Sequence, residues 1–296
     1  MTGWVRGIDV SHYQPPAVIT DRAAAGDRFA FVKVSEGTRA DKVNGAHGAA
    51  ASHAGIAAGG YHFYRSSVDP VRQAQVFCAE LALSTWGLPP VLDYENQSGA
   101  ESPGRLLSFL EEVERRTGRV PIVYSNAPWW AETIGNDRRF ARFPFWLAKY
   151  PYRYEDGATL PPFPSMPSAP APWVSPAIWQ YSTTSGRLDR NVMTPQAFAT
   201  LTRAVPVPVP DGQKFPGVIH SGDRGQRVQD WAWILRLCGY NGFIVKGESG
   251  KVFKVGKVAA TRRFQKARGL PVTGIVDKAT WDAGVARAKA KKAGAR

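Results

Sequence analysis

The sequence has few cysteines and no long hydrophobic run. Its 296 residues include two cysteines, Cys78 and Cys238, which lie far apart in apolar helical patterns, so we expect two small buried side chains rather than a disulfide or a ligand pair. No segment approaches the roughly 18 apolar residues of a membrane-spanning helix, and we expect no membrane insertion. The opening MTGWVRGIDVSHYQPP lacks the apolar core of a secretory signal, so export would need another route.

Acidic residues are scarce only in the C-terminal part. The chain has a net charge of +14, but residues 1–210 hold 20 Lys and Arg against 18 Asp and Glu, whereas residues 211–296 hold 18 against 6. The run VPVPVP at 205–210 coincides with this change and favours an extended polyproline spacer. We therefore predict a first domain over 1–204, a linker over 205–215 and a basic second domain over 216–296.

Short apolar runs alternate with helical patterns before the linker. Helical periodicity is clearest over 70–83 and 102–117. Strands are expected at 5–10, 29–34, 59–64, 90–95, 120–125, 145–149, 177–181 and 188–192. Strand followed by helix, repeated over about 200 residues, predicts an α/β fold, a parallel barrel of TIM type with some helices short or missing.

Carboxylates stand near the expected strand ends, where such barrels carry their chemistry. Asp93 and Glu95 are two apart in one strand, so their side chains leave on one face and Tyr94 on the other. Two close carboxyls raise the pKa of one of them and supply an acid beside an anion, as glycosidic cleavage requires. Asp9 and Asp189, at the ends of the first and last strands, would complete a group of four. Two solvated or arginine-paired charges would leave the same D-x-E pattern.

Aromatic residues suited to stacking on sugars are dense near these strand ends, although each alone is as typical of a core: Tyr61, Phe63, Tyr64, Tyr124, Trp129, Trp130, Trp146, Trp179 and Tyr181. Together they indicate a carbohydrate groove. The five histidines have no metal-ligand spacing, and phosphate-loop and dinucleotide motifs are missing, so we expect neither a metal nor a cofactor. Lys33 and Glu36 suggest an ion pair at the rim.

Eight segments in order carry a resemblance to a known family: GIDVSHYQ (7–14), FVKVSEGT (31–38), GGYHFYR (59–65), PPVLDYEN (89–96), PIVYSN (121–126), FWLAKY (145–150), IWQYS (178–182) and LDRNV (188–192). They resemble the strand motifs of glycoside hydrolase family 25, the lysozymes of the muramidase type. The resemblance implies a flattened TIM-like β/α barrel that cleaves the β-1,4 bond between N-acetylmuramic acid and N-acetylglucosamine in bacterial peptidoglycan.

The same resemblance implies roles for the acidic residues. Glu95 corresponds to the proton donor, and Asp93 to the residue that orients or stabilises the 2-acetamido group, whose carbonyl attacks the anomeric carbon. Asp9 and Asp189 would tune the charge of this pair or bind sugar hydroxyls. Substrate contacts are expected from the strand motifs and from the density of aromatic residues at Tyr61, Phe63, Tyr124, Trp146 and Gln180.

The basic C-terminal domain contains three amphipathic patterns. A helix capped by Asp223 and ended by Gly239 is followed by helices over 257–268 and 277–288, around a core of Trp231, Phe264, Leu270 and Trp281. GDRGQRVQDWAWILRLCGY and RRFQKARGLPVTGIVDKATWDA resemble the three-helix peptidoglycan-binding domain of cell-wall hydrolases. The connection over 241–257 is longer and more basic than is usual there. Wall binding is favoured over nucleic acid and over a basic surface without a ligand.

These observations predict a monomeric, modular peptidoglycan hydrolase. Its layout resembles a bacteriophage endolysin that passes from the host cytoplasm to the cell wall, and an autolysin secreted by a non-classical route is the alternative. Two other functions stay open at this point. One is a chitinase-like glycosidase, and the other is a catalytically inactive lectin that binds wall glycan.

Overall fold

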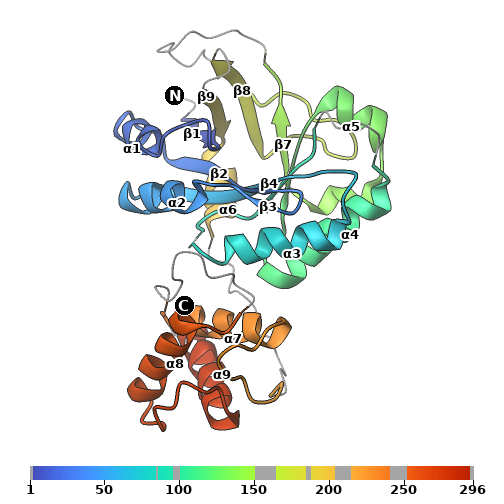
Figure 1. The fold of residues 1–296 in the computed structure, drawn as a ribbon. Coiled ribbons are helices and arrows are strands. Elements are labelled where there is room, and N and C mark those ends of the chain that lie inside the picture. Colours follow the sequence, from blue (N-terminus) through green and yellow to red (C-terminus); the bar gives the residue numbers. More distant parts are fainter. Residues whose placement is uncertain are drawn as a thin grey trace. The chain divides into compact units, whose positions relative to one another are not determined.

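The computed structural model describes residues 3–84, 86–95, 101–150, 165–184, 188–203, 215–240 and 252–293. The chain divides into two compact units, residues 1–205 and 206–296, which are treated separately below (Figure 1). The linker predicted over 205–215 lies outside the described residues except for Phe215.

A closed barrel forms the first unit. Within the described residues its strands are β1 (Val5–Val10), β2 (Phe29–Glu36), β4 (Ala57–Phe63), β5 (Val91–Asp93), β6 (Ile122–Asn126), β7 (Phe145–Ala148), β8 (Ile178–Thr184) and β9 (Leu188–Met193). They pair in the order β1-β9-β8-β7-β6-β5-β4-β2, and the pairing of β1 with β2 closes the ring. The short β3 (Arg39–Ala40) adds to β2. The predicted β/α barrel is confirmed.

The direction of β9 corrects the all-parallel prediction. β9 runs antiparallel to both β1 and β8. Only residues 185–187 separate β8 from β9, which is too short for the crossover that a parallel pair requires. Asp189 therefore lies near the start of its strand and not at the end. Because the strand is reversed, this start reaches the same rim as the ends of the parallel strands.

Helices connect the strands: α1 (Ala17–Ala24), α2 (Asn44–His53), α3 (Pro70–Leu81), α4 (Pro103–Thr117), α5 (Ala127–Thr133), the 3₁₀ helix η1 (Arg138–Arg142) and α6 (Pro195–Thr202). The two predicted helices, α3 and α4, lie side by side (Figure 1). Each has proline in its first turn and a capping side chain before it, Asp69 and Ser102 respectively. Gly118, with φ of 66°, ends α4 in a left-handed conformation.

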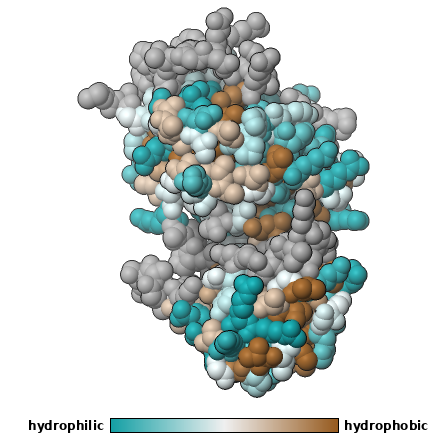
Figure 2. All heavy atoms as spheres, turned by 60° about the vertical axis from the view of Figure 1, so that its left-hand side comes forward, coloured by the Kyte–Doolittle hydropathy of each residue, from teal (hydrophilic) through white to brown (hydrophobic). Residues whose placement is uncertain are grey.

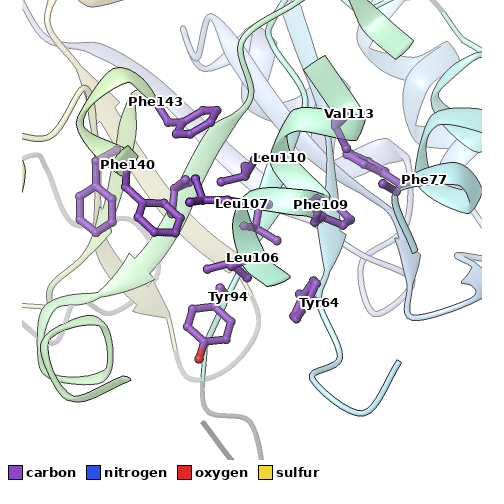
Figure 3. Packing of buried hydrophobic residues seen from close by; sticks show 14 of the residues in the cluster. Tyr64, Phe77, Tyr94, Leu106, Leu107, Phe109, Leu110, Val113, Phe140 and Phe143 are labelled. Atoms are coloured by element: carbon purple, nitrogen blue, oxygen red, sulfur yellow. The ribbon is translucent and has the colours of Figure 1, made fainter. Parts of the chain in front are cut away.

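The largest apolar core lies outside the barrel wall, against α3, α4 and the segment from α5 to η1. Figure 3 shows Phe77 and Phe109 packed beside Tyr64, with Tyr94 of the β5 strand end pointing into the same cluster. Tyr94 is fully buried there. Since side chains alternate along an extended strand, Asp93 and Glu95 point the other way, into the barrel mouth, as predicted.

Three helices form the core of the second unit: α7 (Gln226–Leu237), α8 (Val255–Ala267) and α9 (Lys278–Ala293). Trp231, Phe264 and Trp281 are buried together and Leu270 packs against them, as predicted. Asp277 caps α9 by accepting from the Thr280 amide at 2.8 Å.

Asp223, the predicted cap of α7, lies three positions before the first residue of that helix. It lies before the first turn, where it accepts from the backbone amide of His220 and pairs with Arg227. Most of the long connection, residues 241–251, lies outside the described residues.

Cys78 and Cys238 are both thiols that form no disulfide, as expected; Cys78 is partly buried and Cys238 is buried. On the face drawn in Figure 2, hydrophilic side chains are interspersed with smaller hydrophobic areas. No helix among the described residues is long and apolar enough to cross a membrane.

Candidate active site

The predicted acidic residues meet on the inner face of the barrel at one rim. Asp9 of β1 lies opposite Asp189 of β9. Asp93 of β5 lies between Phe63 of β4 and Tyr124 of β6. Directly paired residues on neighbouring strands point to the same face of a sheet, so these side chains converge.

Asp93 is buried, and one of its two carboxyl oxygens accepts no hydrogen bond from the described residues. Its side chain is 6% exposed, and among the described residues its Oδ1 has no hydrogen-bond partner. Burial raises the pKa of Asp93 well above its usual range, the charge of Glu95 raises it further, and the Lys33 ammonium opposes them. A buried oxygen of this kind is a candidate acceptor for a donor on a bound ligand.

Glu95 sits higher in the mouth and is partly buried. The Tyr124 hydroxyl oxygen lies 3.4 Å from its Oε2. Burial raises the pKa of Glu95, and the negative charge of Asp189 adds to this effect. A carboxyl group with a raised pKa keeps its proton closer to neutral pH, as a general acid must.

Asp9 is held by two amide side chains. Gln180 donates from Nε2 to Asp9 Oδ2 at 2.9 Å, and Asn191 donates from Nδ2 to the same oxygen at 2.7 Å. Burial raises the pKa of Asp9 well above its usual range, with Asp189 the next contributor. Sequence reasoning missed Asn191. It stands two residues after Asp189 in an extended strand, and this D-x-N spacing places both on one face.

Tyr61, Tyr124 and Gln180 lie at the mouth as predicted. Tyr124 donates to Gln180 Oε1 at 2.8 Å, and the hydroxyl of Tyr150, which the sequence did not single out, donates to the same atom at 2.5 Å. The pKa of Tyr61 is raised well above its usual range by burial and by the neighbouring charges of Asp9 and Asp93.

Phe63 marks one side of the rim. The Lys33 ammonium lies 5.0 Å from its ring centre and the Arg65 guanidinium 4.7 Å from it. Both cations pair with Glu36, which confirms the predicted Lys33–Glu36 pair at 2.6 Å. Two cationic side chains therefore lie against the ring of Phe63, and this residue is partly exposed.

Trp146 lies beneath the mouth and not on its surface. It is 2% exposed and packs on Phe31 and Tyr124 inside the barrel. Its indole Nε1 donates to Asn191 Oδ1 at 2.9 Å. Four of the other aromatic residues are buried in apolar clusters, so they belong to the core and not to a sugar-binding surface: Tyr64, Trp130, Trp179 and Tyr181.

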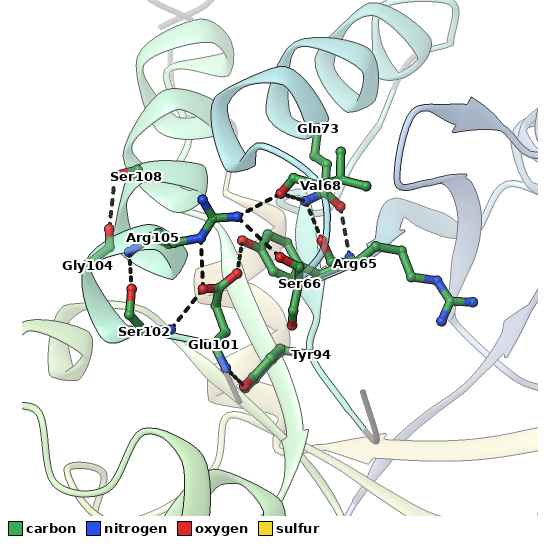
Figure 4. Close-up of polar contacts among 11 residues, drawn as sticks. Arg65, Ser66, Val68, Gln73, Tyr94, Glu101, Ser102, Gly104, Arg105 and Ser108 are labelled. Atoms are coloured by element: carbon green, nitrogen blue, oxygen red, sulfur yellow. Dashed lines mark hydrogen bonds and ion pairs between the residues drawn. The ribbon is translucent and has the colours of Figure 1, made fainter. Parts of the chain in front are cut away.

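A polar cluster outside the barrel holds the strand end that carries the acidic pair (Figure 4). Glu101, 5% exposed, accepts from the Tyr64 hydroxyl at 2.8 Å and from Arg105 Nε at 2.9 Å. Its own backbone amide donates to the hydroxyl of Tyr94 at 3.2 Å. Tyr94 stands between Asp93 and Glu95, so the cluster fixes the backbone of that pair. The sequence offered no signal for it, because the contacts join residues up to 39 positions apart.

Comparison with known proteins decides the family. The model of the family described as Glycosyl hydrolases family 25 matches residues 8–189, which is more than half of the chain. The chain belongs to glycosyl hydrolase family 25. Residues 224–283 match a second description, Putative peptidoglycan binding domain. The family resemblance and the helical domain expected from the sequence are thus confirmed.

Relatives of this family 25 chain agree with that assignment. Lysozyme M1 of Streptomyces globisporus is 33% identical over 224 residues, which cover 69% of this chain and 72% of that protein. The N,O-diacetylmuramidase of Chalaropsis sp is 30% identical over 60% of this chain and 88% of its own length. The solved lysozyme of Streptomyces coelicolor has a TM-score of 0.57 at 30% identity and covers 69% of this chain and all of its own.

Proposed function

We propose that this family 25 glycoside hydrolase is a lysozyme of the N-acetylmuramidase type, which cleaves the β-1,4 bond between N-acetylmuramic acid and N-acetylglucosamine in bacterial peptidoglycan. The observation that carries the proposal is the pairing of Glu95, whose pKa is raised, with Asp93, whose Oδ1 is a buried acceptor without a partner among the described residues. The lysozyme and muramidase names of the relatives support it.

In the proposed reaction Glu95 donates its proton to the glycosidic oxygen as the bond to the anomeric carbon breaks. Asp93 accepts a hydrogen bond from the acetamido N–H of the substrate, which orients the acetamido carbonyl oxygen toward the anomeric carbon. That oxygen attacks and forms a cyclic oxazolinium, which the negative charge of Asp93 stabilises. Glu95, now ionised, takes a proton from water as the water opens the ring. Substrate-assisted cleavage of this kind replaces a protein nucleophile.

Asp9, Asp189 and the mouth residues complete the proposed site. Asp9 and Asp189 set the negative potential around the acidic pair. Tyr61, Tyr124 and Gln180 would contact sugar hydroxyls and the acetamido group, and Phe63 would border the groove. Trp146 would act from below, through Asn191.

The second unit is proposed to hold the enzyme on the wall. Its match to a peptidoglycan-binding domain supports this role, and tethering would raise the local concentration of the barrel at its substrate. A bacteriophage endolysin, monomeric and acting on the wall from the host cytoplasm, is the origin that we propose for this layout. An autolysin secreted by a non-classical route is the alternative.

Digestion of purified peptidoglycan by the intact chain tests the proposal. Products are reduced with borohydride and weighed by mass spectrometry. Fragments ending in reduced muramic acid are expected. Fragments ending in reduced glucosamine would indicate a glucosaminidase, activity on chitin but not on wall would indicate a chitinase-like enzyme, and wall binding without products would indicate a lectin.

A further inference from the structure

A chain of hydrogen bonds runs from Trp146 through Asn191 to Asp9. The indole Nε1 of Trp146 donates to Asn191 Oδ1 at 2.9 Å, and Asn191 Nδ2 donates to Asp9 Oδ2 at 2.7 Å. All three side chains are buried. An indole nitrogen is a donor only, so it dictates which end of the amide faces it. The oxygen of Asn191 must point to Trp146, and its nitrogen must point to Asp9.

Gln180 repeats this arrangement from the neighbouring strand. It lies opposite Asn191 in the β8–β9 pairing. The hydroxyls of Tyr124 and Tyr150 converge on its Oε1, which leaves Nε2 to donate to Asp9 Oδ2 at 2.9 Å. One oxygen of Asp9 thus receives two N–H donors, and the indole of Trp146 sets the orientation of one of them, Asn191. An oxygen with two N–H donors is a poor site for a proton.

The other side of Asp9 faces a second carboxyl group. Asp189 lies directly opposite Asp9 in the β1–β9 pairing. After burial, the charge of Asp189 is the next cause that raises the pKa of Asp9. The two N–H donors on Oδ2 oppose that effect, because they favour the ionised form of Asp9.

We propose that Trp146 and Asn191 are positioning residues of the active site, which hold Asp9 Oδ2 as an acceptor and thereby favour the ionised form of Asp9. Neither residue needs to touch the substrate for this role. The arrangement fixes where negative charge lies beside Asp93 and Glu95, which sense Asp9 and Asp189 respectively. The effect expected on catalysis rests on the proposed function, whereas the effect on Asp9 does not.

The alternative is that Trp146 only fills the barrel, where its ring lies 4.5 Å from that of Phe31 and 4.8 Å from that of Tyr124. Trp179 on the adjacent strand provides a matched control. It is equally buried, at 4% exposure, and its indole donates to the backbone oxygen of Lys149 at 2.7 Å. Replacing either tryptophan by phenylalanine removes the same atoms and the indole hydrogen bond. The bond of Trp146 goes to Asn191, which donates to Asp9, whereas the bond of Trp179 goes to a backbone oxygen.

The experiment compares Trp146→Phe and Asn191→Leu with Trp179→Phe in the full chain. Carboxyl carbons of ¹³C-labelled aspartate are titrated by NMR, and the Asp9 signal is assigned by its loss in Asp9→Asn. The pKa of Asp9 is expected to rise in the first two variants, because N–H donors that favour the charged form are lost or misaligned, and to stay unchanged in Trp179→Phe. In wall digestion kcat should fall about tenfold in the first two variants with little change in KM.

Two results would overturn the proposal. One is a pKa of Asp9 that is unchanged from the parent in both Trp146→Phe and Asn191→Leu. The other is an equal loss of kcat in Trp146→Phe and Trp179→Phe. If Trp146→Phe does not fold, β-(3-benzothienyl)alanine at position 146 keeps the ring shape and lacks only the N–H. The titration is measured without substrate, so its outcome is separate from the product analysis that tests the muramidase function.

Discussion

At the scale of single residues, environment separates the roles of two carboxyl groups that lie two positions apart. Asp93 is buried below the mouth beside the Lys33 ammonium, whereas Glu95 is nearer the surface and senses Asp189. Their pKa values are both raised, through different neighbours. Each neighbour is therefore a place where the chemistry can be altered without touching the pair itself.

Replacement of Glu95 tests the assignment of the acid. Glu95→Gln cannot release a proton to the leaving oxygen, so kcat on purified wall should fall by at least about 100-fold. Unfolding temperature and sedimentation with wall should stay near those of the parent. Glu111→Gln, on the exposed side of α4, is the control and should keep full activity. Wall lysis that survives Glu95→Gln would show that another group is the acid.

The charge of Asp189 should set the alkaline limb of activity. Glu95 must be protonated to act, so kcat/KM falls as pH rises through its pKa. Because Asp189 raises that pKa, Asp189→Asn should move the alkaline limb to lower pH, whereas the exposed Asp21→Asn should not. A limb that stays in place, or moves to higher pH, would contradict the electrostatic role of Asp189.

Burial of Asp93 should cost stability at neutral pH. Its folded pKa lies above the unfolded value of about 3.9. The unfolded chain therefore releases a proton that the folded chain retains, and stability falls as pH rises from about 4 toward the folded pKa. Asp93→Asn should raise the unfolding temperature of the barrel by about 3 °C at pH 7 and by less at pH 4, while activity is lost. Calorimetry at both pH values measures this difference, and an equal or lower unfolding temperature at pH 7 would refute it.

Much of the site was predictable at this scale, and the exceptions have physical causes. Alternation along a strand placed Asp93 and Glu95 on the inner face, and the same rule applied to Asp189 would have found Asn191. Composition alone could not separate Phe63, at the rim, from Trp146, below it. Both are aromatic residues on inward-facing positions, and only the depth along the barrel distinguishes them.

At the scale of elements, the polar cluster around Glu101 ties the start of α4 to the strand end of the acidic pair. Arg105 adds bonds to the backbone oxygens of Ser66 and Val68, at 3.2 and 3.0 Å, in the segment after β4 (Figure 4). Two strand ends and one helix are thereby held together by one buried carboxylate.

Removal of that negative charge should destabilise the barrel. Glu101→Gln keeps the shape of the side chain but weakens its bonds to Tyr64 and Arg105, at an expected cost of about 2 kcal/mol in the free energy of unfolding. Glu114→Gln in α4, which breaks the more exposed pair with Arg142 of η1, should cost less than about 1 kcal/mol. Urea unfolding followed by tryptophan fluorescence compares them. Equal losses of unfolding free energy in the two variants would mean that the buried bonds of Glu101 stabilise the barrel no more than the exposed pair of Glu114 does.

Strand direction was the element-level property that the sequence analysis missed for β9. All the strand positions of the barrel were predicted within a few residues, because buried apolar runs mark strands whichever way they point. The reversal of β9 follows from the short connection after β8, a constraint of chain length that an all-parallel interpretation overlooked.

At the scale of the whole molecule, the excess of basic over acidic residues is concentrated in residues 211–296, which hold 18 Lys and Arg against 6 Asp and Glu. On α8 the cations Arg262, Arg263 and Lys266 are exposed, and this helix contains no acidic residue. If wall polymers with negative charge hold the enzyme, these side chains are the first candidates for the contact.

Neutralising this face should weaken wall binding in a salt-dependent way. The triple variant Arg262→Gln, Arg263→Gln, Lys266→Gln should sediment several-fold less with purified wall at low salt, with a smaller difference at high salt because ions screen exposed charges. The control removes the same charge from exposed positions of the barrel unit, Arg39→Gln, Lys42→Gln and Arg72→Gln. An equal loss in both triple variants would assign the effect to net charge and not to α8.

The closure of the barrel by its first and last strands also governs when the enzyme becomes active. Asp9 receives its hydrogen bonds from Gln180 and Asn191, which follow it by 171 and 182 positions. Neither bond can form until the ribosome has made the later residue of the pair. Nearly the whole barrel must therefore leave the ribosome before Asp9 can bind Gln180 and Asn191. A chain that stops before β9 would contain Glu95 but no complete site. Translation itself thus delays the hydrolase until its last strand has been made.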